Sequence, residues 1–227
     1  MSGAGFPKNA VALMGGTFDP IHRGHTESAL AATEIFHLRG VVLVPAGRSP
    51  HKDRDNGISD SERVDLLEAA VGADPRFSIW NVELLREPPS YTVDTIKAYR
   101  NLWLRAYPGE QRPELAWILG DDQLPALASW KDADRLFSSV HPIVVQRGPM
   151  EELSTNLKAL EAQLSKRVVD RLRAGLVPLA DPHPASATEI RSRLASGEDL
   201  GRWLHPQVES EIRSRGLYGA SRSDGAR

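Results

Sequence analysis

Short runs of consecutive apolar residues recur along this chain and are separated by longer segments with helical periodicity. Runs at residues 11–14, 41–44, 115–119 and 143–145 lack the polar alternation that a half-exposed strand shows. Strands that are apolar on both faces are typical of a parallel sheet with helices packed on both sides. The pattern therefore predicts an α/β fold built on a doubly wound parallel sheet, in which ligands bind beyond the carboxyl ends of the strands.

The remaining segments fit around such a sheet. Two further short strands are predicted at residues 77–80 and 176–179. Helical periodicity predicts four longer helices and two short ones, the short pair forming a small helical C-terminal part: residues 24–38, 59–71, 92–107, 150–173, 187–196 and 206–215.

Composition excludes several classes of protein. The 227 residues carry 28 Lys plus Arg against 30 Asp plus Glu, a net charge of −2, so a basic surface for nucleic acid is not expected. There is no cysteine, which excludes a thiol nucleophile, a disulfide and any cysteine-based metal site. No apolar run approaches the ~18 residues that span a bilayer, and residues 1–8 lack the features of a signal peptide. We therefore expect a cytoplasmic protein with no membrane partner.

The domain organisation is expected to be simple. Residues 1–218 show no clear linker and no internal repeat, so they are expected to form a single domain. Residues 219–227 contain no large apolar side chain and are expected to form a disordered tail.

The junction between the first predicted strand and the first predicted helix carries the most informative segment. Two glycines allow backbone to approach a ligand there, and two histidines three residues apart share a face if both lie in the first helical turn: Gly15, Gly16, Thr17, Phe18, His22 and His25. A helix N-terminus attracts phosphate, and imidazoles donate hydrogen bonds to phosphate oxygens. The alternative is a glycine turn followed by ordinary surface histidines.

Two later segments add polar groups near predicted strand and helix ends. His51 and Lys52 lie in a polar loop after the second strand, where they either close over a triphosphate or are simply solvated. Tyr91 and Thr92 stand at a predicted helix start, where Thr92 either caps the helix or contacts a ligand. A cap and a ligand contact are compatible, so both interpretations stay open.

A fourth segment follows the buried strand at 115–119. Gly120 and Asp122 bring a carboxylate to the ligand edge of the sheet, where ribose hydroxyls are natural donors. Trp130 offers a flat face on which an electron-poor pyridine ring stacks, with Lys131 beside it, although packing in the core is the alternative for Trp130.

The fifth segment is a second helix start. Ser186, Thr188 and Arg191 present two hydroxyls and a guanidinium there, and the alternative is a plain N-cap. The scattered histidines, His183 among them, have no polar constellation in the sequence and are assigned no role.

The segment from His22 to His25 resembles the His/Thr-x-Gly-His signature of a nucleotidyltransferase superfamily, in which it marks the ATP phosphate site. All five segments, in this order, are similar to those of the bacterial nicotinate-nucleotide adenylyltransferases. One departure is Ala185, which stands where that family has isoleucine at the start of its last motif. This change weakens a packing contact more than a polar one.

The resemblance implies a Rossmann-like nucleotidyltransferase fold and the transfer of AMP from ATP to nicotinate mononucleotide, giving deamido-NAD and pyrophosphate in NAD biosynthesis. It implies Mg²⁺ held mainly by ATP phosphates, with no metal ligand from protein side chains. Two alternatives stay open, namely nicotinamide mononucleotide as the acceptor and a non-catalytic nucleotide-binding module on the same fold. The oligomeric state also stays open, with a homo-oligomer as one alternative.

The resemblance also implies roles for individual residues. The implied catalytic residues are His22, His25, Lys52 and Arg191. The implied ATP-binding residues are Gly15, Gly16, Thr17, Phe18, His22, His25, Gly120, Asp122, Ser186, Thr188 and Arg191. The implied residues that bind nicotinate mononucleotide are Gly16, Thr17, His51, Lys52, Tyr91, Thr92, Trp130 and Lys131.

Overall fold

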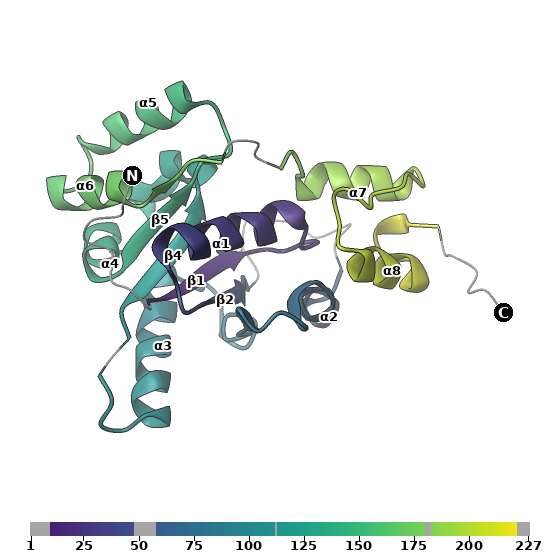
Figure 1. The fold of residues 1–227 in the computed structure, drawn as a ribbon, viewed down its shortest axis with the longest axis horizontal. Helices are drawn as coiled ribbons and strands as arrows, with labels where there is room; N and C mark the ends of the chain where they lie inside the picture. The colour runs from purple at the N-terminus through teal and green to yellow at the C-terminus, as the bar shows by residue number, and fades with distance from the viewer. Residues whose placement is uncertain (1–9, 48–57, 112, 180–182, 222–227) are drawn as a thin grey trace.

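The structure, a computed structural model, describes residues 10–47, 58–111, 113–179 and 183–221 (Figure 1). Within these ranges six parallel strands form one sheet: β1 (Val11–Gly16), β2 (Gly40–Pro45), β3 (Phe77–Ile79), β4 (Leu115–Gly120), β5 (His141–Val145) and β6 (Leu176–Val177). Their order is β3-β2-β1-β4-β5-β6, so the path of the chain across the sheet reverses between β1 and β4. The predicted doubly wound sheet is confirmed, and the loops that follow β1 and β4 diverge at this reversal.

Helices cover both faces of the sheet because successive residues of a strand point to opposite sides. Ala12 and Met14 of β1 belong to a core shared with α1 (Arg23–Phe36), α2 (Asp60–Val71), α7 (Ala187–Ala195) and α8 (Pro206–Arg215). Val11 and Leu13 belong to the opposite core, shared with α3 (Thr92–Ala106), α4 (Ala133–Ser139), α5 (Met150–Leu160) and α6 (Lys166–Ala174). Figure 1 shows α7 and α8 together at the end of the molecule that lies opposite α5 and α6.

One predicted helix, over residues 150–173, is wrong, because α5 and α6 are separated by a turn at residues 161–165. The hydroxyl and the backbone N–H of Ser165, which precedes α6, donate to the carboxylate of Asp134 in α4, the N–H at 3.1 Å from Oδ1. Asp134 is 31 residues away in the chain. The local periodicity therefore cannot show that the helix is interrupted here.

The sequence also missed two short elements between residues 120 and 140. These are the 3-10 helix η1 (Asp121–Ser129) and α4, nine and seven residues long. Leu124, Leu136 and Phe137 in them are fully buried. Elements this short span about two turns, which is too few to set up a clear apolar period.

The C-terminal boundary of the folded part lies beyond the expected position. A 3-10 helix, η2 (Leu217–Gly219), follows α8, and Ala220 is buried in the core around α1. The expected start of a disordered tail at residue 219 therefore needs correction, because Ala220 packs against apolar side chains. Residues 222–227 lie outside the described residues. No helix in the described ranges is both long and apolar enough to cross a membrane.

Candidate active site

A cavity of about 490 Å³ opens at the carboxyl ends of β1 and β4, where the strand order reverses. Eight of the residues predicted to bind substrates line it: Gly15, Gly16, Thr17, His25, Thr92, Gly120, Asp122 and Trp130. They come from three of the five predicted segments. The structure thus brings together eight of the 17 residues predicted to bind substrates, at the edge of the sheet where ligands of this fold bind.

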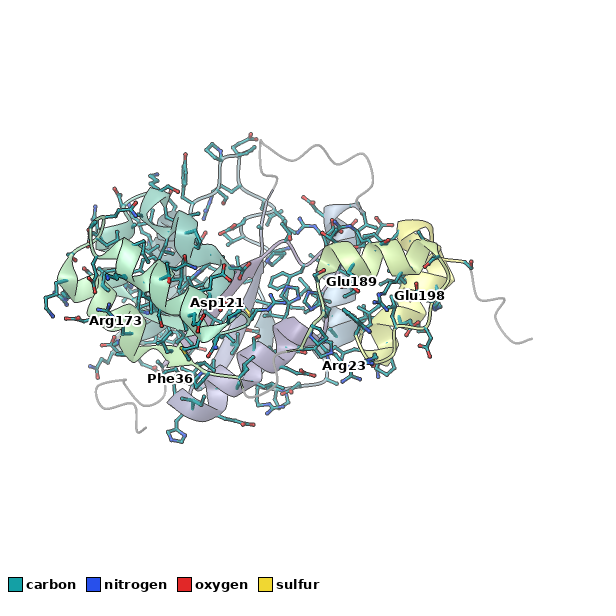
Figure 2. All side chains as sticks on the ribbon, turned by 90° about the horizontal axis from the view of Figure 1, so that it is seen from above. Arg23, Phe36, Asp121, Arg173, Glu189 and Glu198 are labelled. Atoms are coloured by element: carbon teal, nitrogen blue, oxygen red, sulfur yellow. The ribbon has the colours of Figure 1, made fainter. Side chains whose placement is uncertain are left out.

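A second cavity of about 510 Å³ adjoins the first, since Asp122 and Arg147 line both. Ser186 and His183 line the second cavity, from the chain that leads into α7. Figure 2 shows Asp121, at the start of η1, in the middle of the molecule, between the α5–α6 side and the α7–α8 side. The two cavities together offer an elongated space for a ligand that has more than one part.

The two predicted histidines form one unit at the start of α1. His22 is the N-cap residue, and its backbone N–H donates to Nδ1 of His25 at 3.3 Å. The ring centroids lie 3.7 Å apart with an interplanar angle of 31°. Because Nδ1 of His25 accepts a hydrogen bond, the neutral ring carries its proton on Nε2. His25, which lines the cavity, therefore has an N–H group to donate to a ligand.

Neither histidine is charged near neutral pH. Burial, followed by the positive charge of Arg147, lowers the pKa of His25 to about 3. Burial and the neighbouring His25, with a smaller effect of Arg147, lower the pKa of His22 to about 2. Desolvation and a nearby cation both disfavour the imidazolium form. In the free protein these rings supply hydrogen-bond donors, and positive charge comes from other residues.

Gly24, between the histidines, stands where a side chain would have little room. A Cβ atom at this position would lie 3.1 Å from Nδ1 of His22 and 3.6 Å from Nη2 of Arg147. Phe18 supports the pair from the core, since its ring is fully buried and meets the His25 ring edge-on at a centroid distance of 5.0 Å. Phe18 thus contacts His25 and does not line the cavity.

Arg147 is a site residue that sequence reasoning missed. It follows β5, and its backbone N–H and that of Gly148 donate to Oδ2 of Asp121 at 3.1 and 3.0 Å. Its guanidinium donates to the carbonyl of Ala185 at 2.9 Å and lines both cavities. The available signal was the polar run Gln146-Arg147-Gly148 directly after a buried strand, at the same edge of the sheet as Gly120.

The predicted segment before α7 is only partly in the cavities. Ser186 caps α7, its Oγ accepting from the N–H of Glu189 at 3.2 Å, and it also lines the second cavity. Thr188 and Arg191 do not line either cavity. Nη2 of Arg191 lies 3.4 Å from Oγ1 of Thr188, and Nη1 donates to the carbonyl of Asp19 at 2.7 Å. Arg191 therefore lies against the segment that joins β1 to α1.

Thr92 and Trp130 also line the first cavity. Trp130 also packs against the core, 5.9 Å from the Phe137 ring, which is the alternative role predicted for it, and its stacking on a pyridine ring stays a prediction. Tyr91 and Lys131 lie outside the lining; Lys131 pairs with Asp94 at 3.0 Å and its ammonium stands 4.5 Å from the centre of the Tyr91 ring. His51 and Lys52 lie outside the described residues.

Glu83 is a second residue that the sequence did not reveal. It is buried and lines the first cavity near Thr92. Thr95 donates its hydroxyl to Oε1 of Glu83 at 2.5 Å, and burial raises the pKa of this carboxyl group. In the part of the chain that the structure describes, no three or more His, Asp or Glu side chains gather into a metal-binding group.

The fold and the site together define a nucleotide-binding α/β protein, with its ligands at the reversal of a parallel sheet. Residues 13–193 match the model of the cytidylyltransferase-like family, and the chain belongs to that family. It is 36% identical over 220 residues to the nicotinate-nucleotide adenylyltransferase of Salmonella typhi, covering 93% of this chain and 99% of that protein. It is 38% identical over 209 residues to a Moorella thermoacetica protein named "Probable nicotinate-nucleotide adenylyltransferase", covering 92% and 91%.

A solved structure shows the same fold. Plasmodium falciparum nicotinic acid mononucleotide adenylyltransferase, complexed with APC, superposes with a TM-score of 0.67 at 17% identity, covering 94% of this chain and 98% of that one. The same enzyme complexed with NaAD gives a TM-score of 0.66.

Proposed function

We propose that this chain transfers AMP from ATP to nicotinate mononucleotide, giving deamido-NAD and pyrophosphate in NAD biosynthesis, as a single catalytic domain in the cytoplasm. One observation carries the proposal: the stacked His22–His25 pair at the start of α1, with His25 facing a cavity at the reversal of the sheet. The names of the relatives, which the chain matches over nearly their whole length, support this choice of substrates.

The reaction needs alignment and charge stabilisation more than acid–base chemistry. The 5′-phosphate of the mononucleotide attacks the α-phosphorus of ATP in line, and pyrophosphate leaves. The attacking phosphate is already an anion at pH 7, so no general base is required. The Nε2–H group of His25 donates to a phosphate oxygen, while Arg147 and Arg191 supply positive charge. A predicted further cation is Lys52.

The two cavities divide the substrates in this proposal. ATP lies along the β1–α1 junction and into the second cavity, on the predicted residues that line these cavities: Gly15, Gly16, Thr17, His25, Gly120, Asp122 and Ser186. The other predicted ATP-binding residues, Phe18, His22, Thr188 and Arg191, line neither cavity, and we propose that they act through their contacts with His25, with each other and with the β1–α1 segment. The pyridine nucleotide takes the part of the first cavity that is lined by Gly16, Thr17, Thr92 and Trp130. Tyr91 and Lys131, also predicted to bind it, lie outside this lining, and the predicted residues His51 and Lys52 lie outside the described residues. Trp130 provides the flat face on which the pyridine ring stacks.

A divalent cation accompanies ATP in this class of enzyme, and we propose Mg²⁺ here. Asp121 accepts two backbone N–H groups through Oδ2, so it is engaged in fixing the loop after β5. The donor set around the cavities suits an ion that arrives already bound to phosphate oxygens and water. When bound, the ion neutralises charge on the departing pyrophosphate.

The decisive experiment is pyrophosphate release from ATP with nicotinate mononucleotide, run beside nicotinamide mononucleotide. We expect a strong preference for the acid. Equal rates, or a preference for the amide, would overturn the acceptor while leaving the chemistry in place. Calorimetric binding of both nucleotides without any release of pyrophosphate would favour the non-catalytic module instead.

A further inference from the structure

Asp19 lies in the segment that joins β1 to α1, three residues before His22. Two residues from the C-terminal part of the chain donate hydrogen bonds to it. The carbonyl oxygen of Asp19 accepts from Nη1 of Arg191 at 2.7 Å, across 172 residues of sequence. Its Oδ1 accepts from the hydroxyl of Tyr218 at 2.7 Å, across 199 residues. Both contacts reach the segment that delivers the histidine pair to the cavity.

The fold holds the Tyr218 hydroxyl in place and keeps it protonated. It lies in η2, with Leu217 and Ala220 buried in the core on either side of it. Burial, the hydrogen bond to Asp19 and the negative charge of Asp19 raise the pKa of Tyr218. The hydroxyl is therefore a permanent donor, and Asp19 is its acceptor.

The same segment is held from its other side by α2. Arg63, only 1% exposed, donates to the carbonyl of Thr17 at 2.6 Å and to that of Ala46 at 2.9 Å. Two guanidinium groups thus fix the carbonyls of Thr17 and Asp19, on either side of Phe18, whose φ of +46° lies in the left-handed region. A residue other than glycine rarely adopts that backbone conformation unless neighbouring groups hold it in place.

This arrangement fixes the position of the Arg191 guanidinium. Among the described residues, no carboxylate pairs with it within 4.0 Å, and it donates to the carbonyl of Asp19 and to the hydroxyl of Thr188. Figure 2 shows Glu189, on the same helix, on the α7–α8 side, where it pairs with Arg193 at 2.6 Å. The positive charge of Arg191 is therefore left for a ligand, and the Asp19 carbonyl fixes where that charge stands.

We infer that Tyr218 and Asp19 are positioning residues for the phosphate site: Tyr218 orients Asp19, and Asp19 holds the guanidinium of Arg191 beside the β1–α1 segment. This inference rests on the proposed function, because it assigns Arg191 to the phosphates of ATP. The end of the folded chain thereby sets the geometry of the start of α1. Misplacement of a phosphate-binding group by about 1 Å is enough to cost 10²-fold in rate.

Substitutions that remove or keep a single hydrogen-bonding group test this inference. Tyr218→Phe loses only the hydroxyl, and we expect kcat to fall about tenfold and ATP affinity, measured by calorimetry, to fall about fivefold. Asp19→Asn keeps an acceptor oxygen and should stay within about threefold of the native protein, whereas Asp19→Ala should lose at least as much as Tyr218→Phe. The control is Tyr107→Phe, a hydroxyl removed from a residue that is 45% exposed after α3.

A double-mutant cycle separates positioning from general stability. If Tyr218 acts through Arg191, then Tyr218→Phe changes neither kcat nor ATP affinity further in an Arg191→Ala background. Multiplicative losses would overturn the inference, as would a lower melting temperature with native kcat and ATP affinity. A native chain that binds ATP but releases no pyrophosphate overturns the proposed function, and the calorimetric cycle still decides the role of Tyr218. Absence of ATP binding in the native chain overturns both.

Discussion

At the scale of single residues, the site works with uncharged imidazoles next to fixed guanidinium groups. His25 accepts from the backbone of His22 through Nδ1, which leaves Nε2–H for the ligand. Arg147, close enough to lower the pKa of both rings, supplies the positive charge that they lack. This division lets one helix start offer directed donors without a cluster of buried charges, which is costly to desolvate.

The donor role of His25 can be tested with two amides. His25→Asn keeps an acceptor for the His22 N–H but loses the donor at Nε2, so we expect kcat to fall roughly 10²-fold. His25→Gln places an amide N–H near the lost Nε2–H and should recover part of that loss. KM values should change less than kcat. The control is His37→Asn, at an exposed left-handed position (φ 51°) after α1 where asparagine is tolerated.

Steady-state kinetics of the three variants checks this assignment. Equal losses in His25→Asn and His25→Gln would show that the imidazole is needed for something other than one N–H donor. A native kcat in His25→Asn would remove this residue from the phosphate site altogether.

The lowered pKa of His25 also makes stability depend on pH. An unfolded histidine takes up its proton near pH 6.5, while folded His25 does so only near pH 3, so the unfolded state binds more protons between these values. Stability therefore falls as the pH falls through this window, by about 2 kcal/mol for this residue between pH 7 and pH 5. Urea unfolding of the native protein and His25→Asn should show that difference in their pH dependence. Parallel curves would contradict the neutral state assigned to His25.

At the scale of elements, the sequence predicted the strands well because a run of consecutive apolar residues is enough to identify each of them. Each of β1, β2, β4 and β5 is an apolar run buried on both faces, and burial of both faces is what the missing alternation indicates. The turn between α5 and α6 was not predictable in this way, because Asp134, which binds Ser165, belongs to another helix.

The same distinction applies to the site. Gly120 and Asp122 were predictable because they stand at the end of the buried strand β4, and His25 because it lies in the first turn of the helix that follows β1, so that all three reach the ligand edge of the sheet. Glu83 was not predictable, because it is buried through its contact with Thr95 of α3, and no pattern in the neighbouring residues indicates that contact. Thr188 and Arg191, predicted to contact ATP, line neither cavity, and the contact of Arg191 with the carbonyl of Asp19, 172 residues away, could not be predicted from the motif.

One buried contact between elements has a large expected effect on stability. Arg63 of α2 joins the ends of β1 and β2 through the carbonyls of Thr17 and Ala46 and also pairs with Asp60 at 2.9 Å. Arg63→Lys cannot reach all three oxygens, so we expect the free energy of unfolding to fall by about 2–4 kcal/mol. Urea unfolding measures it. Arg76→Lys, in an exposed pair with Asp74, is the control and should leave the free energy of unfolding nearly unchanged. Equal losses would contradict this role of Arg63.

At the scale of the whole molecule, the site joins two halves of one sheet. The half with β3, β2 and β1 supplies the glycines and the histidine pair, and the half with β4, β5 and β6 supplies Asp122 and Arg147. Near the C-terminus, Ser186 before α7 lines the second cavity, and Arg191 of α7 donates to the carbonyl of Asp19 in the β1–α1 segment. A ligand that occupies both cavities therefore stabilises contacts between parts of the chain that are far apart in sequence.

Hydrogen exchange of the intact protein tests this arrangement with each substrate alone. At about 100 times its Kd, ATP should add about 2.7 kcal/mol to the free energy of unfolding, and its local protection should extend to residues 186–191. Nicotinate mononucleotide should instead protect residues 83–95, because Thr92 is predicted to bind it and both Thr92 and Glu83 line the first cavity. Both should protect residues 15–25, which the two substrates share. Peptides from α6, which lines neither cavity, serve as the control and should show only the global effect. Protection of 186–191 by the mononucleotide, or of 83–95 by ATP, would mean that the two cavities are assigned to the wrong substrates.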